Sequence, residues 1–188
     1  MATKRKAPAR KAPARKPARK STAAAVQVIS PCLWFDGQAE EAARFYVSVF
    51  KKGKITGITR YPAVGQETHQ QHAGTVMTVE FVLNGLPFLA LNGGPAFRFN
   101  EAVSLQVLCR TQAEIDDYWE RLGEGGDPKA QMCGWLKDRF GLSWQIVPAG
   151  WARMHKDHKA PATQRAFAAM MEMKKLDIAK LQAAYKGK

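Results

Sequence analysis

The sequence lacks a hydrophobic run long enough to cross a membrane, since no apolar stretch approaches the roughly 18 residues that such a helix needs. Its first residues also lack the charged, apolar and small-residue regions of a secretory signal peptide. Membrane and secreted classes are therefore disfavoured. We expect a cytoplasmic protein with one compact domain plus appendages, as is typical of 188 residues of which 46% are hydrophobic.

Cysteine is scarce. Cys32, Cys109 and Cys133 are odd in number, widely spaced and in no Cys-x-x-Cys arrangement, which is typical of reduced thiols in the cytoplasm. Lys137 would lower the pKa of the Cys133 thiol if the two were also close in space, but no histidine lies nearby in the sequence. We therefore assign no catalytic residue.

Acidic residues are missing from one end of the chain. Residues 1–27 carry nine Lys or Arg and no acid, residues 28–150 carry a net charge of −2, and residues 151–188 carry a net charge of +6. The whole chain has a net charge of +13. The charge therefore divides the sequence into a basic tail (1–27), a nearly neutral domain (28–150) and a basic C-terminal extension (151–188).

The tail repeats the pentapeptide KAPAR, and its prolines block a continuous helix. With no apolar side chain larger than Ala in the repeat, we expect a disordered segment that resembles the tails of linker-histone-like proteins. Three roles stay open: non-specific contact with nucleic acid or another polyanion, which would associate the protein with the nucleoid; an inert solvated tail; and a targeting peptide, which the prolines disfavour. The candidate polyanion contacts are Lys4, Arg5, Lys6, Arg10, Lys11, Arg15, Lys16, Arg19 and Lys20.

The neutral domain contains an internal repeat. The tripeptide Gln-Ala-Glu occurs at 38–40 and again at 112–114, each time after a short run typical of a buried strand and before a helical pattern. In the second copy, Thr111 and Glu114 form the sequence pattern of a capping box, and in the first copy Asp36 and Gly37 precede the expected helix.

A second match, in the same order, pairs the segment NGLPFLALNGG (84–94) with FGLSWQIVPAG (140–150). Each contains a turn followed by a strand. Each copy therefore predicts a strand, a helix, and two or three further strands, with module one at 28–100 and module two at 101–150. Chance similarity of short motifs is the alternative.

Three motifs resemble a known family. WFDGQAEEAARFY (34–46), VMTVEFVLNGLPFLALNGGPAFRFNEAVS (76–104) and CGWLKDRFGLSWQIVP (133–148) are similar to the PhnB-like, or 3-demethylubiquinone-9 3-methyltransferase, branch of the vicinal oxygen chelate superfamily, also called the glyoxalase/bleomycin resistance/dioxygenase superfamily. The resemblance covers about residues 26–187. It implies an α+β fold of two tandem βαβββ modules that form a cupped, mixed and mostly antiparallel sheet. It also implies that the chain forms a homodimer.

Catalytic members of this superfamily hold a divalent metal in the cup with His, Glu or Gln side chains. The resemblance places the four ligand positions of this chain at Ser30, Leu89, Ser104 and Gln145, and one neutral amide with two hydroxyls is a poor ligand set for a transition metal. We therefore expect no metal and no other cofactor. The four histidines, His69, His72, His155 and His158, are expected in solvated loops.

The alternation of side chains along a strand predicts further residues that share a face with the four ligand positions, and together they predict a pocket. Side chains spaced by two along each strand share the cup face, and Asn92, in a glycine turn that matches no nucleotide-binding motif, is placed at the rim. The alternative is that these side chains fill the cup as core. The predicted lining is Cys32, Trp34, Leu89, Leu91, Asn92, Gln106 and Gln145.

The C-terminal extension predicts two helices. Pro161 and Thr163 precede an apolar face that includes Phe167 and Met171, and Asp177 is placed to cap a second helix. One apolar and one basic face favour docking of these helices on the domain or on a second copy of the chain.

We therefore expect a metal-free protein that binds an unidentified small molecule. The alternatives are a metal-dependent lyase, dioxygenase or transferase of the same superfamily, with ligands at other positions, and a nucleic-acid-associated protein that acts through its tail. Methyl transfer from S-adenosylmethionine normally uses a doubly wound domain with a glycine-rich first loop, a pattern that this sequence does not show. We expect no contact with a membrane.

Overall fold

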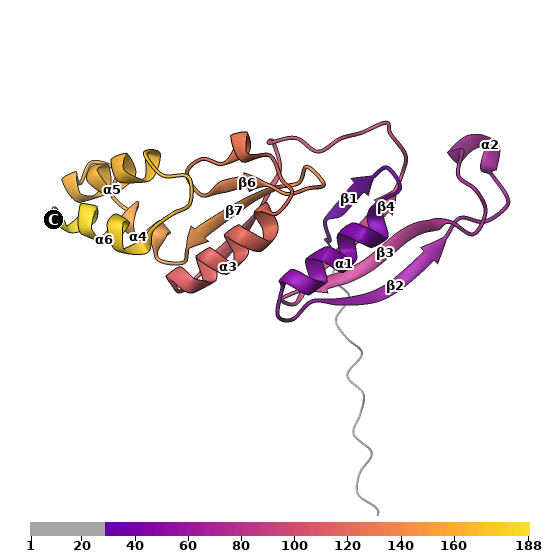
Figure 1. Cartoon of the computed structure of the whole chain (residues 1–188), viewed down its shortest axis with the longest axis horizontal. Coiled ribbons are helices and arrows are strands. Elements are labelled where there is room, and N and C mark those ends of the chain that lie inside the picture. Colours follow the sequence, from indigo (N-terminus) through magenta and orange to yellow (C-terminus); the bar gives the residue numbers. More distant parts are fainter. Residues whose placement is uncertain (1–28) are drawn as a thin grey trace, which may run out of the picture.

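The computed structural model describes residues 29–188, which form two mixed α/β units side by side and a group of helices at the C-terminal end (Figure 1). The first unit, module one, consists of β1 (Cys32–Phe35), α1 (Ala39–Val49), β2 (Lys54–Arg60), α2 (Gln66–His69), β3 (Val76–Leu83) and β4 (Leu86–Asn92). The second, module two, consists of β5 (Ser104–Cys109), α3 (Gln112–Gly123), the short 3-10 helix η1 (Pro128–Ala130), β6 (Trp135–Lys137) and β7 (Ser143–Pro148). The last helices are α4 (Trp151–Met154), α5 (Pro161–Met171) and α6 (Ile178–Lys186).

Each module has its own sheet. Sheet A of module one has the strand order β1-β4-β3-β2, and sheet B of module two has the order β5-β7-β6. In both sheets the first strand runs parallel to the last strand of the module, and the remaining pairs are antiparallel. The α+β class with mixed sheets predicted from the sequence is confirmed. Module two, however, forms one strand fewer than the βαβββ pattern, because η1 occupies the connection after α3.

The two long helices of the modules start differently. The predicted capping box of α3 is confirmed, since the Thr111 hydroxyl accepts from the Glu114 amide at 3.2 Å and the Glu114 carboxylate accepts from the amide of Thr111. In α1, the side chain of the capping residue Gln38 makes no capping bond to any of the described residues. Instead, the Ala39 amide donates to the side-chain oxygen of Asn92, 53 positions away. The start of α1 is therefore completed by β4 and not by Asp36 and Gly37.

Aromatic side chains form the core where the two modules meet. Tyr46 on α1 and Phe50, the residue that follows α1, lie 5.6 and 5.7 Å (ring centroids) from Trp144 on β7, and Phe50 lies 5.1 Å from Tyr118 on α3. Tyr46 and Trp144 are almost completely buried. Arg121 on α3 adds a hydrogen bond of 3.0 Å to the Val49 carbonyl at the end of α1. One continuous core therefore joins the two modules.

The C-terminal helices are attached to module two by the segment between α5 and α6. The amides of Cys133 and Gly134 donate to the carbonyls of Met173 and Lys174 at 2.7 and 2.8 Å, and Leu176 is buried. The predicted cap of α6 is confirmed, because Asp177 accepts from the Lys180 amide at 2.9 Å. None of the helices within residues 29–188 has the length and apolar character that a membrane span requires.

Candidate functional site

Four of the predicted pocket residues form one patch on sheet A. Strand β1 pairs with β4 so that Cys32 lies beside Leu89 and Trp34 lies beside Leu91, and paired side chains share a face of a sheet. This face is opposite to α1, which covers the alternate residues of the same strands, among them the buried Leu33, Phe35 and Ala90. We call it the open face of sheet A.

A cavity of about 670 Å³ opens at the end of this face, and Trp34 and Leu91 both line it. The other walls are Tyr61, the segment Thr68–Gln71 that includes His69, and the segment Gly93–Ala96. We call this the Trp34 cavity. Two of the seven predicted residues therefore line this cavity, and His69 and Tyr61 join them although the sequence interpretation did not assign them there.

The aromatic rings of the Trp34 cavity are held in place by hydrogen bonds. The Trp34 indole donates to the Gly94 carbonyl at 2.8 Å, and the Tyr61 hydroxyl donates to the Asn92 carbonyl at 2.5 Å. The His69 ring lies 4.6 Å from the Tyr61 ring and accepts from the Gln71 amide at Nδ1. His69 was expected to be solvated. Its contact with Tyr61 instead makes it a half-buried wall of the cavity.

Gly93 is required for the position of Trp34. A Cβ added at Gly93 would lie 2.2 Å from the indole ring, which is far inside van der Waals contact. The ring therefore packs directly against the backbone at this point. No signal in the sequence distinguishes this glycine from its neighbour Gly94, because the contact joins two residues, Gly93 and Trp34, that are 59 positions apart.

Asn92 does not line the Trp34 cavity through its side chain. It is 5% exposed and lies on the helix-covered face of β4. Its oxygen accepts from the Ala39 amide at 2.8 Å and its nitrogen donates to the Val76 carbonyl at 2.9 Å. The structure thus places Asn92 as the cap of α1, on the opposite side of the sheet from the face that the rim prediction assumed.

The remaining two predicted residues, Gln106 and Gln145, lie on sheet B and contact each other. Gln106 donates to the Gln145 oxygen at 3.3 Å, and Gln145 donates to the Ser104 hydroxyl at 2.8 Å. This face of sheet B is opposite to α3, and we call it the open face of sheet B. The structure thus assigns the seven predicted residues to different surfaces rather than to one cup.

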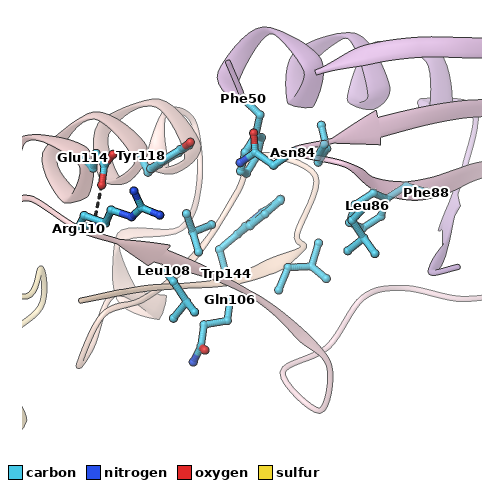
Figure 2. Close-up of a pocket in the computed structure, with 13 residues that line it drawn as sticks. Phe50, Asn84, Leu86, Phe88, Gln106, Leu108, Arg110, Glu114, Tyr118 and Trp144 are labelled. Atoms are coloured by element: carbon cyan, nitrogen blue, oxygen red, sulfur yellow. Dashed lines mark hydrogen bonds between the residues drawn. The ribbon is translucent and has the colours of Figure 1, made fainter. Parts of the chain in front are cut away.

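A second cavity, of about 420 Å³, lies at the junction of the two modules and includes Gln106 (Figure 2). We call it the junction cavity. Its apolar walls come from Phe50 at the end of α1, from β3 and β4, from β5 and from β7, and Figure 2 shows the Trp144 ring between the two halves. Polar groups lie at one side, where Arg110 and Glu114 approach Tyr118 (Figure 2). Burial raises the pKa of Tyr118, and its hydrogen bond with Asn84 opposes that shift.

One polar group of the junction cavity, the Glu114 carboxylate, is already engaged by backbone amides. Glu114 accepts from the Arg110 amide at 2.6 Å, and this bond, ahead of the other contributions, holds the pKa of the Glu114 carboxyl below its ordinary value. Because Glu114 also closes the capping box of α3, we interpret this side of the junction as structural.

The four positions at which the resemblance would place metal ligands do not fit a metal. The Ser30 hydroxyl donates to the Pro87 carbonyl at 3.0 Å, and the Ser104 hydroxyl and the Gln145 amide bind each other. Leu89 offers no donor atom. Within residues 29–188, moreover, no group of three or more His, Cys, Asp or Glu side chains is arranged to hold a metal ion. The chemistry of this donor set therefore does not suit the metal that catalytic members of the superfamily hold.

The three cysteines have different environments. Cys109 is 1% exposed, and burial, with a smaller contribution from Glu114, raises the pKa of its thiol to about 12. Cys32 is exposed on the open face of sheet A, and partial burial raises the pKa of its thiol. Cys133 lies 3.8 Å (Sγ to Sδ) from Met171. Among the described residues, these environments provide no activated nucleophile. The nine candidate polyanion contacts of the tail lie outside the described residues.

Comparison with known proteins decides the family. The model of the family described as 3-demethylubiquinone-9 3-methyltransferase matches residues 27–147, which is more than half of the chain. The chain belongs to this family. The match includes both sheets and ends before the C-terminal helices.

The PhnB protein from Bacillus cereus is 37% identical to this chain, with a TM-score of 0.56, over 65% of this chain and 100% of the other. This similarity supports a PhnB-like domain. Protein PA1353 from Pseudomonas aeruginosa is 21% identical with a TM-score of 0.49, over 64% of this chain and 96% of the other. A protein from Staphylococcus aureus is 28% identical with a TM-score of 0.27, over 64% of this chain and 94% of the other. A search of functionally curated proteins gave no significant match.

Proposed function

We propose that this PhnB-like protein binds a small planar molecule in the Trp34 cavity without the help of a metal ion. The observation that carries the proposal is the meeting of three aromatic rings, Trp34, Tyr61 and His69, around a cavity of about 670 Å³ on the open face of sheet A. Aromatic walls with a few polar groups are typical of small-molecule sites. The Nε2 atom of His69, 3.4 Å from the Val64 carbonyl, is a polar group at the same wall.

The position of Trp34 supports a flat ligand. The indole is fixed by its bond to Gly94 and by the close approach of Gly93, so its ring does not need to be ordered when a ligand stacks on it. A fixed aromatic surface lowers the entropy cost of binding.

A screen of planar aromatic compounds by ligand-observed NMR tests this proposal. The variant Trp34→Leu removes the stacking surface, and Trp151→Leu is the matched control, because Trp151 lies on α4 at the other end of the molecule. We expect hits that bind the wild type and the control but are lost, by at least about tenfold in affinity, in Trp34→Leu. Hits that bind all three proteins equally would place the site elsewhere and contradict the proposal.

We also propose that two copies of the chain associate. Large apolar side chains are exposed on or near the sheets, and they include Leu108 (61% exposed) on the open face of sheet B and Val103 (67%) before it. Exposed apolar surface favours association. Light scattering coupled to size exclusion should give the mass of a dimer, and Leu108→Lys should shift it toward the monomer. A monomeric wild type at micromolar concentration would contradict this part of the proposal.

The alternatives predict different results. A metal-dependent enzyme of the superfamily predicts near one equivalent of transition metal in protein purified from metal-supplemented medium. A nucleic-acid-associated protein predicts that retention on a DNA column depends on salt and disappears when residues 1–27 are deleted. Retention that survives this deletion would exclude the tail as the contact. Methyl transfer, which the family's description names, has no support in the residues of either cavity.

A further inference from the structure

A third cavity, of about 380 Å³, lies on the open face of sheet B and is separate from the Trp34 cavity and the junction cavity. Its floor includes Lys137 on β6 and Ser143 on β7, which are paired across the two strands and therefore share a face of the sheet. Met132, Trp135 and Met171 provide apolar walls. We call it the Ser143 cavity.

Ser143 has an unused hydrogen-bonding group. The residue is 1% exposed, and its Oγ atom is buried with no hydrogen-bond partner among residues 29–188. A buried hydroxyl without a partner costs free energy, and such groups in folded proteins are usually satisfied by the protein, water or a ligand. The neighbouring hydroxyl of Ser104, on the next strand, is by contrast bonded to Gln145. The Ser143 hydroxyl is therefore a polar group at the floor of the cavity that has no hydrogen-bond partner among the described residues.

Lys137 lies beside this hydroxyl and is paired with a carboxylate that is easy to displace. Its ammonium group forms an ion pair with Glu101, and the Lys137 side chain is 24% exposed. Glu101 comes from the connection between β4 and β5, and its side chain is 65% exposed. The hydrogen bond from Lys137 lowers the pKa of the Glu101 carboxyl, so this carboxyl is charged at neutral pH. Ion pairs that are this exposed contribute little to stability, and another carboxylate can replace Glu101 at low cost.

The remaining charges favour an anionic ligand. Lys129 lines the same cavity, so the lining includes two lysines and one glutamate. The methionine side chains, which adapt to ligands of different shape, are 61% exposed at Met132 and 50% exposed at Met171. A cavity with a cation and a hydroxyl at the floor and thioether and indole walls above suits a molecule with one anionic end and an apolar body.

We propose that the Ser143 cavity binds a small carboxylic acid with an apolar body, whose carboxylate replaces Glu101 at Lys137 and accepts a hydrogen bond from the Ser143 hydroxyl. Glu101 then acts as a built-in competitor that occupies Lys137 in the absence of the acid. This site lies in module two and does not depend on the Trp34 cavity, so either proposal can fail without the other.

Methionine-methyl NMR on the full chain tests the proposal. Protein labelled at its methionine methyl groups is titrated with 3-phenylpropionate and, as the neutral analogue, 3-phenylpropionamide. We expect the acid to shift the signals of Met132 and Met171 but not that of Met77, which lies on β3 of the other sheet. The amide should bind at least about tenfold more weakly, because it cannot form a charge-assisted bond with Lys137.

Three variants define the contacts. Lys137→Met should reduce the affinity for the acid to that for the amide, and Ser143→Ala should lower the affinity for the acid by about two- to tenfold. Glu101→Gln should raise the affinity for the acid by about two- to fivefold, because it removes the competing charge. Lys175→Met is the matched control, since Lys175 is ion-paired with Asp116 elsewhere on the surface.

Any one of several results overturns the proposal. Equal binding of the acid and the amide, or equal effects of Lys137→Met and Lys175→Met, would show that no carboxylate is recognised at Lys137. Unchanged signals of Met132 and Met171 at millimolar acid would show that the cavity does not take this class of ligand. Displacement of Glu101 requires a gain of affinity in Glu101→Gln, so an unchanged or lower affinity of this variant for the acid would also contradict the proposal.

Discussion

The hydroxyl of Tyr46 in module one donates a hydrogen bond of 2.9 Å to the Asp138 carboxylate in module two. The same carboxylate accepts from the Trp144 indole at 2.8 Å and from the amides of Phe140 and Leu142 at 2.9 and 3.0 Å. Asp138 is 2% exposed. A buried carboxylate with four donors is fully satisfied, and it links the first helix of one module to the last hairpin of the other.

Loss of this link should destabilise the whole domain. Tyr46→Phe removes one of the four donors and should lower the free energy of unfolding by about 1–3 kcal/mol. Asp138→Asn should cost more, because its NH₂ group would face the Trp144 N–H, and two donors cannot bind each other. Urea denaturation measures both. Tyr185→Phe, on α6, is the control, and an effect of Tyr46→Phe no larger than that of the control would contradict the interpretation.

The same carboxylate gives a pH dependence with a defined sign. Burial raises the pKa of Asp138 above its ordinary value of 3.8, and the bonds from Trp144 and Tyr46 oppose this shift. The folded state therefore holds the proton more tightly than the unfolded state. This contribution to stability is fully present below pH 3.8 and is lost as the pH rises through the raised pKa. The difference in unfolding free energy between wild type and Asp138→Asn should accordingly decrease with pH across this window. An increase would mean that the folded-state pKa is lowered.

Gly93→Ala should disrupt the Trp34 cavity. The added methyl group would lie 2.2 Å from the indole ring, so the ring must move away from Gly94 or the strand must shift. Overpacking of this kind typically costs about 1–3 kcal/mol. Near-ultraviolet circular dichroism and thermal unfolding should both change. Gly150→Ala is the control, because the nearest atom to its added methyl is the flexible end of Arg153 at 3.4 Å. An unchanged spectrum for Gly93→Ala would contradict the contact.

The capping box of α3 should be measurable as stability. Thr111→Ala removes the oxygen that accepts from the Glu114 amide and should cost about 0.5–2 kcal/mol. Thr111→Ser keeps that oxygen and should restore most of the loss. The midpoint of urea unfolding compares the two variants with wild type. Equal losses in both variants would assign the effect to the threonine methyl group rather than to the cap.

The thiols should differ in their rate of modification. Cys109 is 1% exposed with a thiol pKa of about 12, so it should react with a thiol reagent at pH 8 only when the protein unfolds. Cys32 is exposed and Cys133 is half-buried, and both should react in the native protein. Titration with a chromogenic disulfide should therefore give two accessible thiols, and Cys32→Ser should leave one. A third fast thiol in the native protein would contradict the burial of Cys109.

Local patterns in the sequence were sufficient to predict helices of both modules and two of the helix caps. The helical patterns after the two Gln-Ala-Glu tripeptides correspond to α1 and α3, and the Thr111–Glu114 and Asp177 caps form as predicted. These features depend on interactions between residues three or four positions apart, so a short segment of the sequence is enough to predict them. The same reasoning failed for the start of α1, where the donor is satisfied by Asn92 from a distant strand.

Packing between residues that are distant in the sequence determines which side chains line the Trp34 cavity. Strand alternation correctly placed Trp34 and Leu91 on one face, because pairing between β1 and β4 preserves the period of two. Alternation does not tell where a chain turns at the end of a strand. The residues that close the Trp34 cavity, Tyr61 and His69, come from the β2–β3 connection, which the sequence suggests only as a loop.

The α+β class, the repeat of strand, helix and strands, and the family could be predicted from the amino-acid sequence, because each depends on local pattern or on similarity of whole segments. Which side chains contact one another follows from the three-dimensional packing. Asp138 accepts a hydrogen bond from the hydroxyl of Tyr46, which is 92 positions away in the sequence. The Ser143 hydroxyl, on the residue paired with Lys137, has no hydrogen-bond partner among the described residues. Contacts of this kind depend on how the two modules and their strands pack, and packing is a property of the whole chain rather than of any segment.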